Sequence, residues 1–175
     1  MSKNPIGGES AKYCPSEKLS FVFSHYCLLG GGPHLEWNGK KSLLRWRDAF
    51  GDVWFHLPTP SEIQWKAFWL LVEQSGVRTW EGHYTNPDIV DGQGWDFKMK
   101  GPGLRIETRG INAYPGYDSL EPTPGSPFDI LTTAIGILVG CAPHDLSAPP
   151  HSRIYPGILS DVEVDSGDGE EGELA

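Results

Sequence analysis

The amino-acid sequence predicts an α+β fold in which an antiparallel sheet of about five strands carries two helices on one face. Three observations support this class. Segments with apolar residues at every second position lie before and between two longer segments with helical spacing. Both helical segments begin with good capping residues. A chain of 175 residues, 38% of them hydrophobic, is large enough for one domain with a single core.

The first strands are predicted in the N-terminal third of the chain. Residues 18–29 are rich in aromatic and β-branched side chains and alternate in polarity. After a Gly-rich break, strands at 34–37 and 41–47 are expected to form a hairpin. Asn38-Gly39, between them, is the pair favoured in type I′ turns. The inward residues expected in the first strand are Leu19, Phe21 and Phe23.

The clearest helix is predicted within residues 55–77. Ser61 and Gln64 have capping-box spacing, and Gly76 is placed to end the helix. Two adjacent apolar stripes run along it, which is too wide an apolar arc for a helix lying half in water. We therefore expect burial on both sides, or one side in contact with a partner. The stripes are Ile63, Ala67, Leu70 and Leu71, and then Trp65, Phe68, Trp69 and Val72.

A second hairpin and a second helix follow. Strands at 95–100 and 104–109 alternate about a Gly-Pro-Gly turn, which predicts one buried and one wet face. Ser126 is the expected N-cap of the second helix, and Gly140 closes it. The predicted organisation is a flexible lead at 1–16, a single α+β domain at 17–141, and a disordered tail at 142–175 that is Pro-rich and then acidic.

Charge and composition limit the classes of partner. The net charge is −9, but seven of the 23 acids lie in residues 160–175, which contain no Lys or Arg. The 14 bases are scattered along the chain, so no nucleic-acid binding is predicted. The acidic tail either keeps the protein soluble or attracts a basic partner, and the first explanation is favoured.

The same inventory predicts a soluble cytoplasmic protein without a membrane anchor. The three cysteines are widely spaced, which suits a reduced compartment. No signal peptide and no membrane-length apolar stretch is visible. The sequence leaves the oligomeric state open.

Two motifs are fairly specific in combination. The segment DGQGW begins the second hairpin as D-G-x-x-W, and RGINAYPG ends it with the elbow G-x-N-A-Y-P. With a Pro-led helix and a Trp-containing loop, they make about residues 18–140 resemble a group of small bacterial proteins. That group has no established activity, so the resemblance supports the domain boundaries and implies no chemistry.

The elbow and the loop before the second hairpin hold the candidate site residues. In the elbow, Arg109, Asn112 and Tyr114 are candidates for a pocket rim, although turn chemistry explains its Gly, Asn and Pro. In the loop, Trp80 is expected to pack on a helix. The loop also contains one histidine, His83, and several acids, among them Asp91. Their spacing in the sequence is not that of a metal site, so we predict no metal site and no cofactor.

These observations favour a non-enzymatic interaction or accessory (immunity-type) protein that binds another protein. The grounds are the doubly apolar first helix, the seven tryptophans and the missing catalytic constellation. Surface exposure of Trp65/Trp69 or Trp37/Trp46 would support this function. The alternative is a hydrolase-like enzyme with a site at 81–114, which requires four side chains to meet in one cleft: His83, Asp91, Arg109 and Asn112. A third hypothesis is a purely structural domain.

Overall fold

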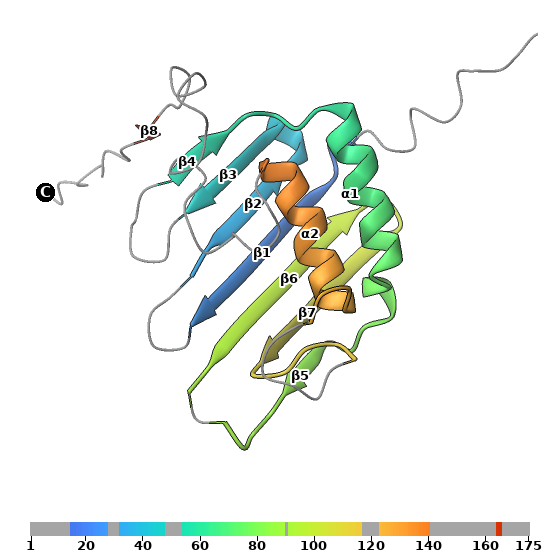
Figure 1. The fold of residues 1–175 in the computed structure, drawn as a ribbon. Helices are drawn as coiled ribbons and strands as arrows, with labels where there is room; N and C mark the ends of the chain where they lie inside the picture. The colour runs from blue at the N-terminus through green and yellow to red at the C-terminus, as the bar shows by residue number, and fades with distance from the viewer. Residues whose placement is uncertain are drawn as a thin grey trace, which may run out of the picture.

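The chain forms an α+β fold in which two helices cover one face of a single sheet (Figure 1). The predicted α+β class is therefore confirmed. The predicted lead at 1–16 and tail at 142–175 lie almost entirely outside the described residues. The computed structural model describes residues 15–27, 32–47, 54–89, 91–116 and 123–140, and the backbone of 164–165.

The sheet is mixed, and within the described residues it has eight strands in the order β5-β7-β6-β1-β2-β3-β4-β8. Neighbouring strands pair antiparallel except β5 and β7, which run parallel. The strands are β1 (Ser20–Cys27), β2 (His34–Asn38), β3 (Leu43–Arg47), β4 (Trp54–Leu57), β5 (His83–Thr85), β6 (Gln93–Gly101), β7 (Leu104–Ile111) and the two-residue β8 (Val164–Asp165).

The prediction of about five antiparallel strands is wrong in number and in pairing. Most of the difference lies in β4 and β5, to which the sequence pattern assigns no strand. They are four and three residues long, and neither shows the alternation over four to eight residues that identifies a strand. Each forms because a longer neighbour, β3 or β7, offers its free edge. Local sequence does not report such pairing.

The predicted hairpin of β2 and β3 is present, but its turn is not type I′. A type I′ turn requires positive φ at Asn38, and the observed φ is −118°. The chain instead passes through a 3₁₀ turn at Gly39–Lys41 and returns through Ser42, with φ 48°. Gly39 N–H donates to Leu19 C=O at 2.8 Å. This tertiary contact holds the loop and outweighs the local turn preference.

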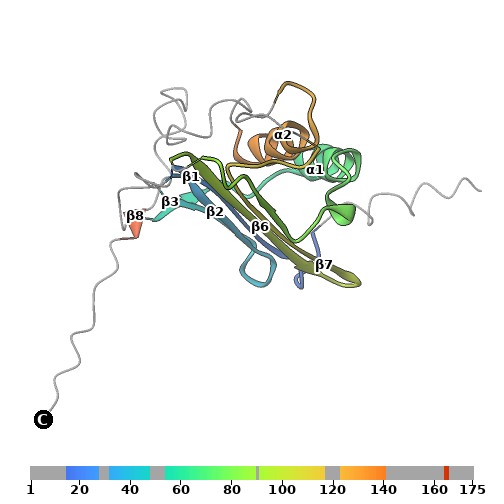
Figure 2. The same cartoon turned by 90° about the horizontal axis from the view of Figure 1, so that it is seen from below.

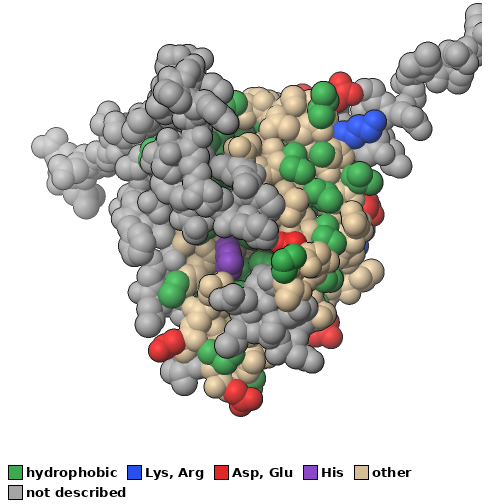
Figure 3. All heavy atoms as spheres, in the orientation of Figure 1, with side chains coloured by type: hydrophobic (Ala, Val, Ile, Leu, Met, Phe, Trp, Pro, Cys, Tyr) green, Lys and Arg blue, Asp and Glu red, His purple; other side chains and the backbone are tan. Residues whose placement is uncertain are grey.

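Helix α1 (Glu62–Gln74) has the predicted capping box and buries only one of its two apolar stripes. The Ser61 side chain accepts from Gln64 N–H, and the Gln64 side chain accepts from Ser61 N–H. On the other stripe, Ile63 is 80% exposed and Leu70 is 66% exposed. Hydrophobic side chains accordingly appear at the surface over α1 (Figure 3). Full burial of both stripes is therefore wrong, although Ala67 and Leu71 of the second stripe are half-buried. The buried stripe comprises Trp65, Phe68 and Val72.

We expect Ile63→Ala and Leu70→Ala to leave the free energy of unfolding nearly unchanged, within about 0.5 kcal/mol. Both side chains stand largely in water in the folded chain, so truncation removes little buried area. Chemical denaturation measures the effect. A loss of more than about 2 kcal/mol at either position would place that side chain in a packed contact and contradict the exposure described for α1.

Helix α2 (Pro127–Val139) lies beside α1 on the same face of the sheet, and no helix of the described residues lies on the opposite face (Figure 2). Its predicted ends are confirmed: Ser126 caps the N-terminus and Gly140 the C-terminus. The Gln64 side-chain amide donates to Ile137 C=O at 2.9 Å, which ties the start of α1 to the end of α2.

The core fills the space between the sheet and the helices. Phe21 of β1 stacks on Phe68 of α1 with ring centroids 5.6 Å apart, and Trp95 of β6 lies 4.9 Å from Phe128 of α2. Burying a side chain of this size contributes about 1.5–3 kcal/mol, so these aromatic contacts hold the two layers together. The inward residues of β6 are Trp95, Phe97 and Met99, as predicted.

Candidate functional site

The elbow after β7 is a structural clamp built on Asn112. This residue has positive φ, 54°, and is only 4% exposed. Its side-chain Oδ1 accepts from Gln93 N–H at 3.0 Å, and its Nδ2 donates to Ile89 C=O at 3.0 Å. Its backbone N–H donates to Gln93 C=O at 2.8 Å. Both polar atoms of the Asn112 side chain therefore bind the protein's own backbone. The geometry supports a structural turn at the elbow.

Glycines in both motifs make room for aromatic rings of neighbouring strands. A side chain at Gly94 would overlap the Tyr26 ring, which lies across it from β1. A side chain at Gly110 would overlap the Trp95 indole and the backbone of Ala113. The Trp95 indole N–H donates to Ala113 C=O at 2.9 Å. The two motifs thus hold each other in place, which accounts for their joint occurrence in the sequence.

Tyr114 belongs to the core rather than to a pocket rim. It is 2% exposed, and its ring lies 4.7 Å from the Phe128 ring. Its hydroxyl donates to Gln93 Oε1 at 3.0 Å, and His25 Nε2 lies 2.9 Å from the same oxygen. Burial lowers the pKa of His25 below its ordinary value of 6.5, while the hydrogen bond to Gln93 opposes the shift.

The remaining predicted site residues separate into a packed group and an exposed group. Trp80 packs against Phe128 and Trp95, and its indole N–H donates to Ser75 C=O at 3.1 Å, as expected for a packed residue. Asp91 is exposed in the loop before β6. His83 and Arg109 are both exposed and sit opposite each other on β5 and β7.

Among the predicted catalytic candidates, only His83 and Arg109 are brought together. Asn112 turns its amide into the elbow, so the four side chains do not share one cleft. Within the described residues no group of three or more His, Cys, Asp or Glu side chains is arranged to hold a metal ion.

The sheet surface opposite the helices, called here the open face, carries side chains that the sequence analysis did not single out. One row crosses it through neighbouring strands. Ser24 lies between Asp96 of β6 and His34 of β2, and Arg47 follows on β3. The whole row, from β5 to β4, is His83, Arg109, Asp96, Ser24, His34, Arg47 and Trp54.

Ser24 Oγ lies 2.8 Å from His34 Nδ1, which is the contact of a nucleophile with a base. Burial and the nearby Arg47 charge lower the pKa of His34. Asp96, however, lies on the opposite side of Ser24 from His34, whereas a catalytic carboxylate orients the imidazole itself. The pair therefore lacks the arrangement of a working triad.

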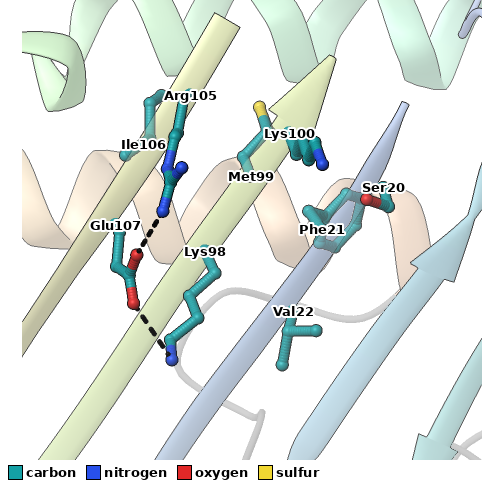
Figure 4. A pocket seen from close by; sticks show the side chains of 9 residues that line it. All are labelled: Ser20, Phe21, Val22, Lys98, Met99, Lys100, Arg105, Ile106 and Glu107. Carbon is teal, nitrogen blue, oxygen red and sulfur yellow. Dashed lines mark hydrogen bonds and ion pairs between the residues drawn. The ribbon is translucent and has the colours of Figure 1, made fainter. Parts of the chain in front are cut away.

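Two shallow hollows lie toward the β5 side of the open face. The larger, about 460 Å³, is lined by residues that include Asp96, Lys98 and Arg109. The smaller, about 240 Å³, contains an ion-pair cluster (Figure 4). In it Glu107 lies 3.3 Å from Lys98 Nζ and 3.5 Å from an Arg105 guanidinium nitrogen. Lys98, and then Arg105, hold the pKa of Glu107 below its ordinary value.

Among the described side chains of the open face, bases outnumber acids, although the whole chain carries a net charge of −9. Each strand sends its bases outward at alternate positions, and pairing then gathers strands that are far apart in sequence. The signal was present as bases alternating with apolar residues within single strands. Among the residues whose side chains the structure describes, the bases are Arg45, Arg47, Lys98, Lys100, Arg105 and Arg109, and the acids are Glu36, Asp96 and Glu107. By backbone pairing, Asp165 of β8 continues the row beyond Trp54.

No family model, curated protein or solved structure matches this chain. The resemblance to small bacterial proteins that share the two motifs therefore stays a prediction. In the part of the chain that the structure describes, neither helix has the length and apolarity needed to cross a membrane.

We expect the free energy of unfolding to fall as the pH drops below about 6.5. The pKa values of His25 and His34 are lowered in the folded chain, so the unfolded chain binds more protons in this range. Stability is therefore retained above the ordinary pKa of 6.5 and lost as the pH falls toward the folded values. Urea denaturation over this pH range measures the slope. His25→Gln should reduce the slope, and an unchanged slope would contradict the burial of neutral His25.

Proposed function

We propose that this chain is a non-enzymatic cytoplasmic interaction protein, of the accessory or immunity type, that binds another protein. The absence of convergent catalytic side chains among the described residues is compatible with this function but does not establish it. The observation that carries the proposal is the surface around Trp54 on the open face.

Trp54 is half-buried on β4, and two arginines of β3 surround its ring. The Arg45 guanidinium lies 4.1 Å from the ring centroid, and that of Arg47 lies 5.2 Å from it. Tryptophan and arginine are the residues most enriched at the energetic centres of protein interfaces. Their grouping on a sheet face that no described helix covers supports a protein-binding role for this surface.

Neither of the tryptophan pairs whose surface exposure would support this function forms an exposed patch. Trp37, Trp46 and Trp65 are all buried beneath the helix layer, and Trp69 is half-buried. Trp37 and Trp65 pack edge to face with centroids 4.9 Å apart, so they belong to the core of one chain. Support for protein binding rests instead on Trp54 and on the two arginines beside its ring.

The hydrolase-like alternative at 81–114 has no supporting geometry, because its four candidate residues do not meet in one cleft. Among the described residues, a nucleophile–base contact on the open face joins Ser24 and His34. It gives the enzyme hypothesis a specific control, the Ser24→Ala variant.

Affinity capture from the native host, with tagged full-length protein as bait, tests the proposed function. We expect one protein to be recovered in near-stoichiometric amount with wild type and strongly reduced with Trp54→Ala. Ile63→Ala is the matched control, because it removes an exposed apolar side chain from the helix layer. Two results would contradict the proposal: no protein recovered above background, or hydrolysis of model esters by the purified protein that Ser24→Ala abolishes.

A further inference from the structure

We infer that the open face binds an acid-rich surface of a protein partner, with Arg47, Lys100 and Arg109 as the contacting cations. This inference rests on the proposed protein-binding function and adds the chemistry of the partner and the residues that recognise it.

Three of the six bases on the open face already have acidic neighbours. Arg45 binds Glu36 with nitrogen and oxygen 2.8 Å apart. Lys98 and Arg105 share Glu107. These pairs neutralise part of the positive charge of the face.

The other three bases form no ion pair within the described residues. They are spread over the face: Arg47 on β3, Lys100 on β6 and Arg109 on β7. Arg47 and Arg109 lie in the same row, four strand spacings apart, or about 19 Å. That distance exceeds the reach of a small anion, and both arginines fit within one standard protein interface of about 800 Å² per partner.

Charge complementarity selects an acidic partner. A guanidinium binds a carboxylate through two parallel N–H···O bonds. Arg47 and Arg109 therefore favour Asp and Glu side chains of the partner as their contacts. The chain as a whole carries net negative charge, whereas this face carries more bases than acids among its described side chains. This difference in charge orients an approaching acidic protein toward the open face. The Trp54 ring, beside Arg45 and Arg47, adds a surface suited to the apolar centre of an interface.

A protein fits this face better than a nucleic acid does. Asp96 lies in the row between Arg109 and Ser24, and Glu36 and Glu107 lie in the next row, so a phosphate backbone would meet carboxylates at regular intervals. The Arg45 guanidinium already covers the Trp54 ring at 4.1 Å, on a face that a stacked base would need. Glu36 and Glu107 already pair with bases of this chain, and a base on a protein surface can approach Asp96.

The test is an NMR titration of isotope-labelled full-length protein with poly-L-glutamate, and separately with oligo(dT) of equal charge. We expect the polypeptide to shift resonances of β3, β6 and β7 and to bind more weakly as salt increases. Reversing two charges, in Arg47→Glu with Arg109→Glu, should weaken binding about tenfold. Lys66→Glu with Arg78→Glu, the same charge change on the helix side, should not.

Three outcomes would overturn the assignment. Tighter binding of oligo(dT) on the same face would indicate a nucleic-acid site. Shifts confined to α1 around Ile63 and Leu70 would move the contact to the helix layer. The third outcome uses no probe: the acids of segment 160–175 are changed to amides in the full-length protein. If this change alone shifts resonances of the open face, that segment itself occupies the face. Arg109, Lys66 and Arg78 are exposed and Arg47 is half-buried. Unchanged unfolding midpoints verify that the variants fold.

The partner captured from the host separates this inference from the proposed function. If that partner binds the Arg47/Arg109 double variant as tightly as wild type, the protein-binding function stands and the surface assignment fails. If no partner is captured while poly-L-glutamate binds at the expected residues, the charge selectivity of the face stands and the proposed function fails.

Discussion

Trp95→Ala should lower the free energy of unfolding by about 3–5 kcal/mol, the largest effect that we expect from a single substitution in this chain. Trp95 is fully buried, and its ring meets rings from three other parts of the chain. Phe128 of α2 lies 4.9 Å away, and Trp80 and Tyr84 each lie 5.9 Å away. Truncation leaves a large cavity where β6, β7 and α2 meet, and urea denaturation followed by circular dichroism measures its cost.

Trp95→Phe separates the ring from its hydrogen bond. Phenylalanine keeps most of the apolar volume but loses the bond from the indole N–H to Ala113 C=O. We expect a cost of about 1–2 kcal/mol, which combines one lost hydrogen bond with a small loss of packing. A cost for Trp95→Ala no larger than that for Trp95→Phe would mean that the ring does not fill the space between β6 and α2.

Local signals in the sequence predicted the elements whose stability is local. The Ser61 and Gln64 side chains form the capping box that their spacing predicts, and Ser126 caps the second helix. The alternation in β6 predicted which side chains face the helices, because a one-residue slip would have turned Trp95 and Phe97 into water. These features depend on residues within a few positions of one another.

Features that depend on pairing over long distances were missed. β4 and β5 form only because β3 and β7 present free edges. The turn at Asn38 follows a contact of Gly39 with Leu19 rather than the preference of the Asn-Gly pair.

The open face and α1 show the same limit for the candidate site. The bases of the open face are scattered in sequence and gather only in the folded sheet. Helical spacing also did not decide which stripe of α1 is buried, because both are apolar and only the position of the sheet chooses between them.

The elbow provides the second large effect: Asn112→Ala should lower the free energy of unfolding by about 2–4 kcal/mol. The change removes both side-chain hydrogen bonds and leaves Gln93 N–H and Ile89 C=O without these partners. It also places a Cβ-bearing residue without a local hydrogen bond at φ 54°. Thermal or urea unfolding measures the loss.

Graded substitutions at Asn112 distinguish a clamp from a binding residue. Asn112→Gly loses the same hydrogen bonds but tolerates positive φ, so it should be about 1 kcal/mol less destabilising than Asn112→Ala. Asn112→Asp keeps an acceptor for Gln93 N–H but turns a carboxylate oxygen toward Ile89 C=O. Because these two oxygens repel each other, Asp should not restore wild-type stability. If all three variants instead unfold like wild type and only capture of a partner is lost, Asn112 is a contact residue. In that case, holding the end of the β6–β7 hairpin does not explain why the two motifs occur together.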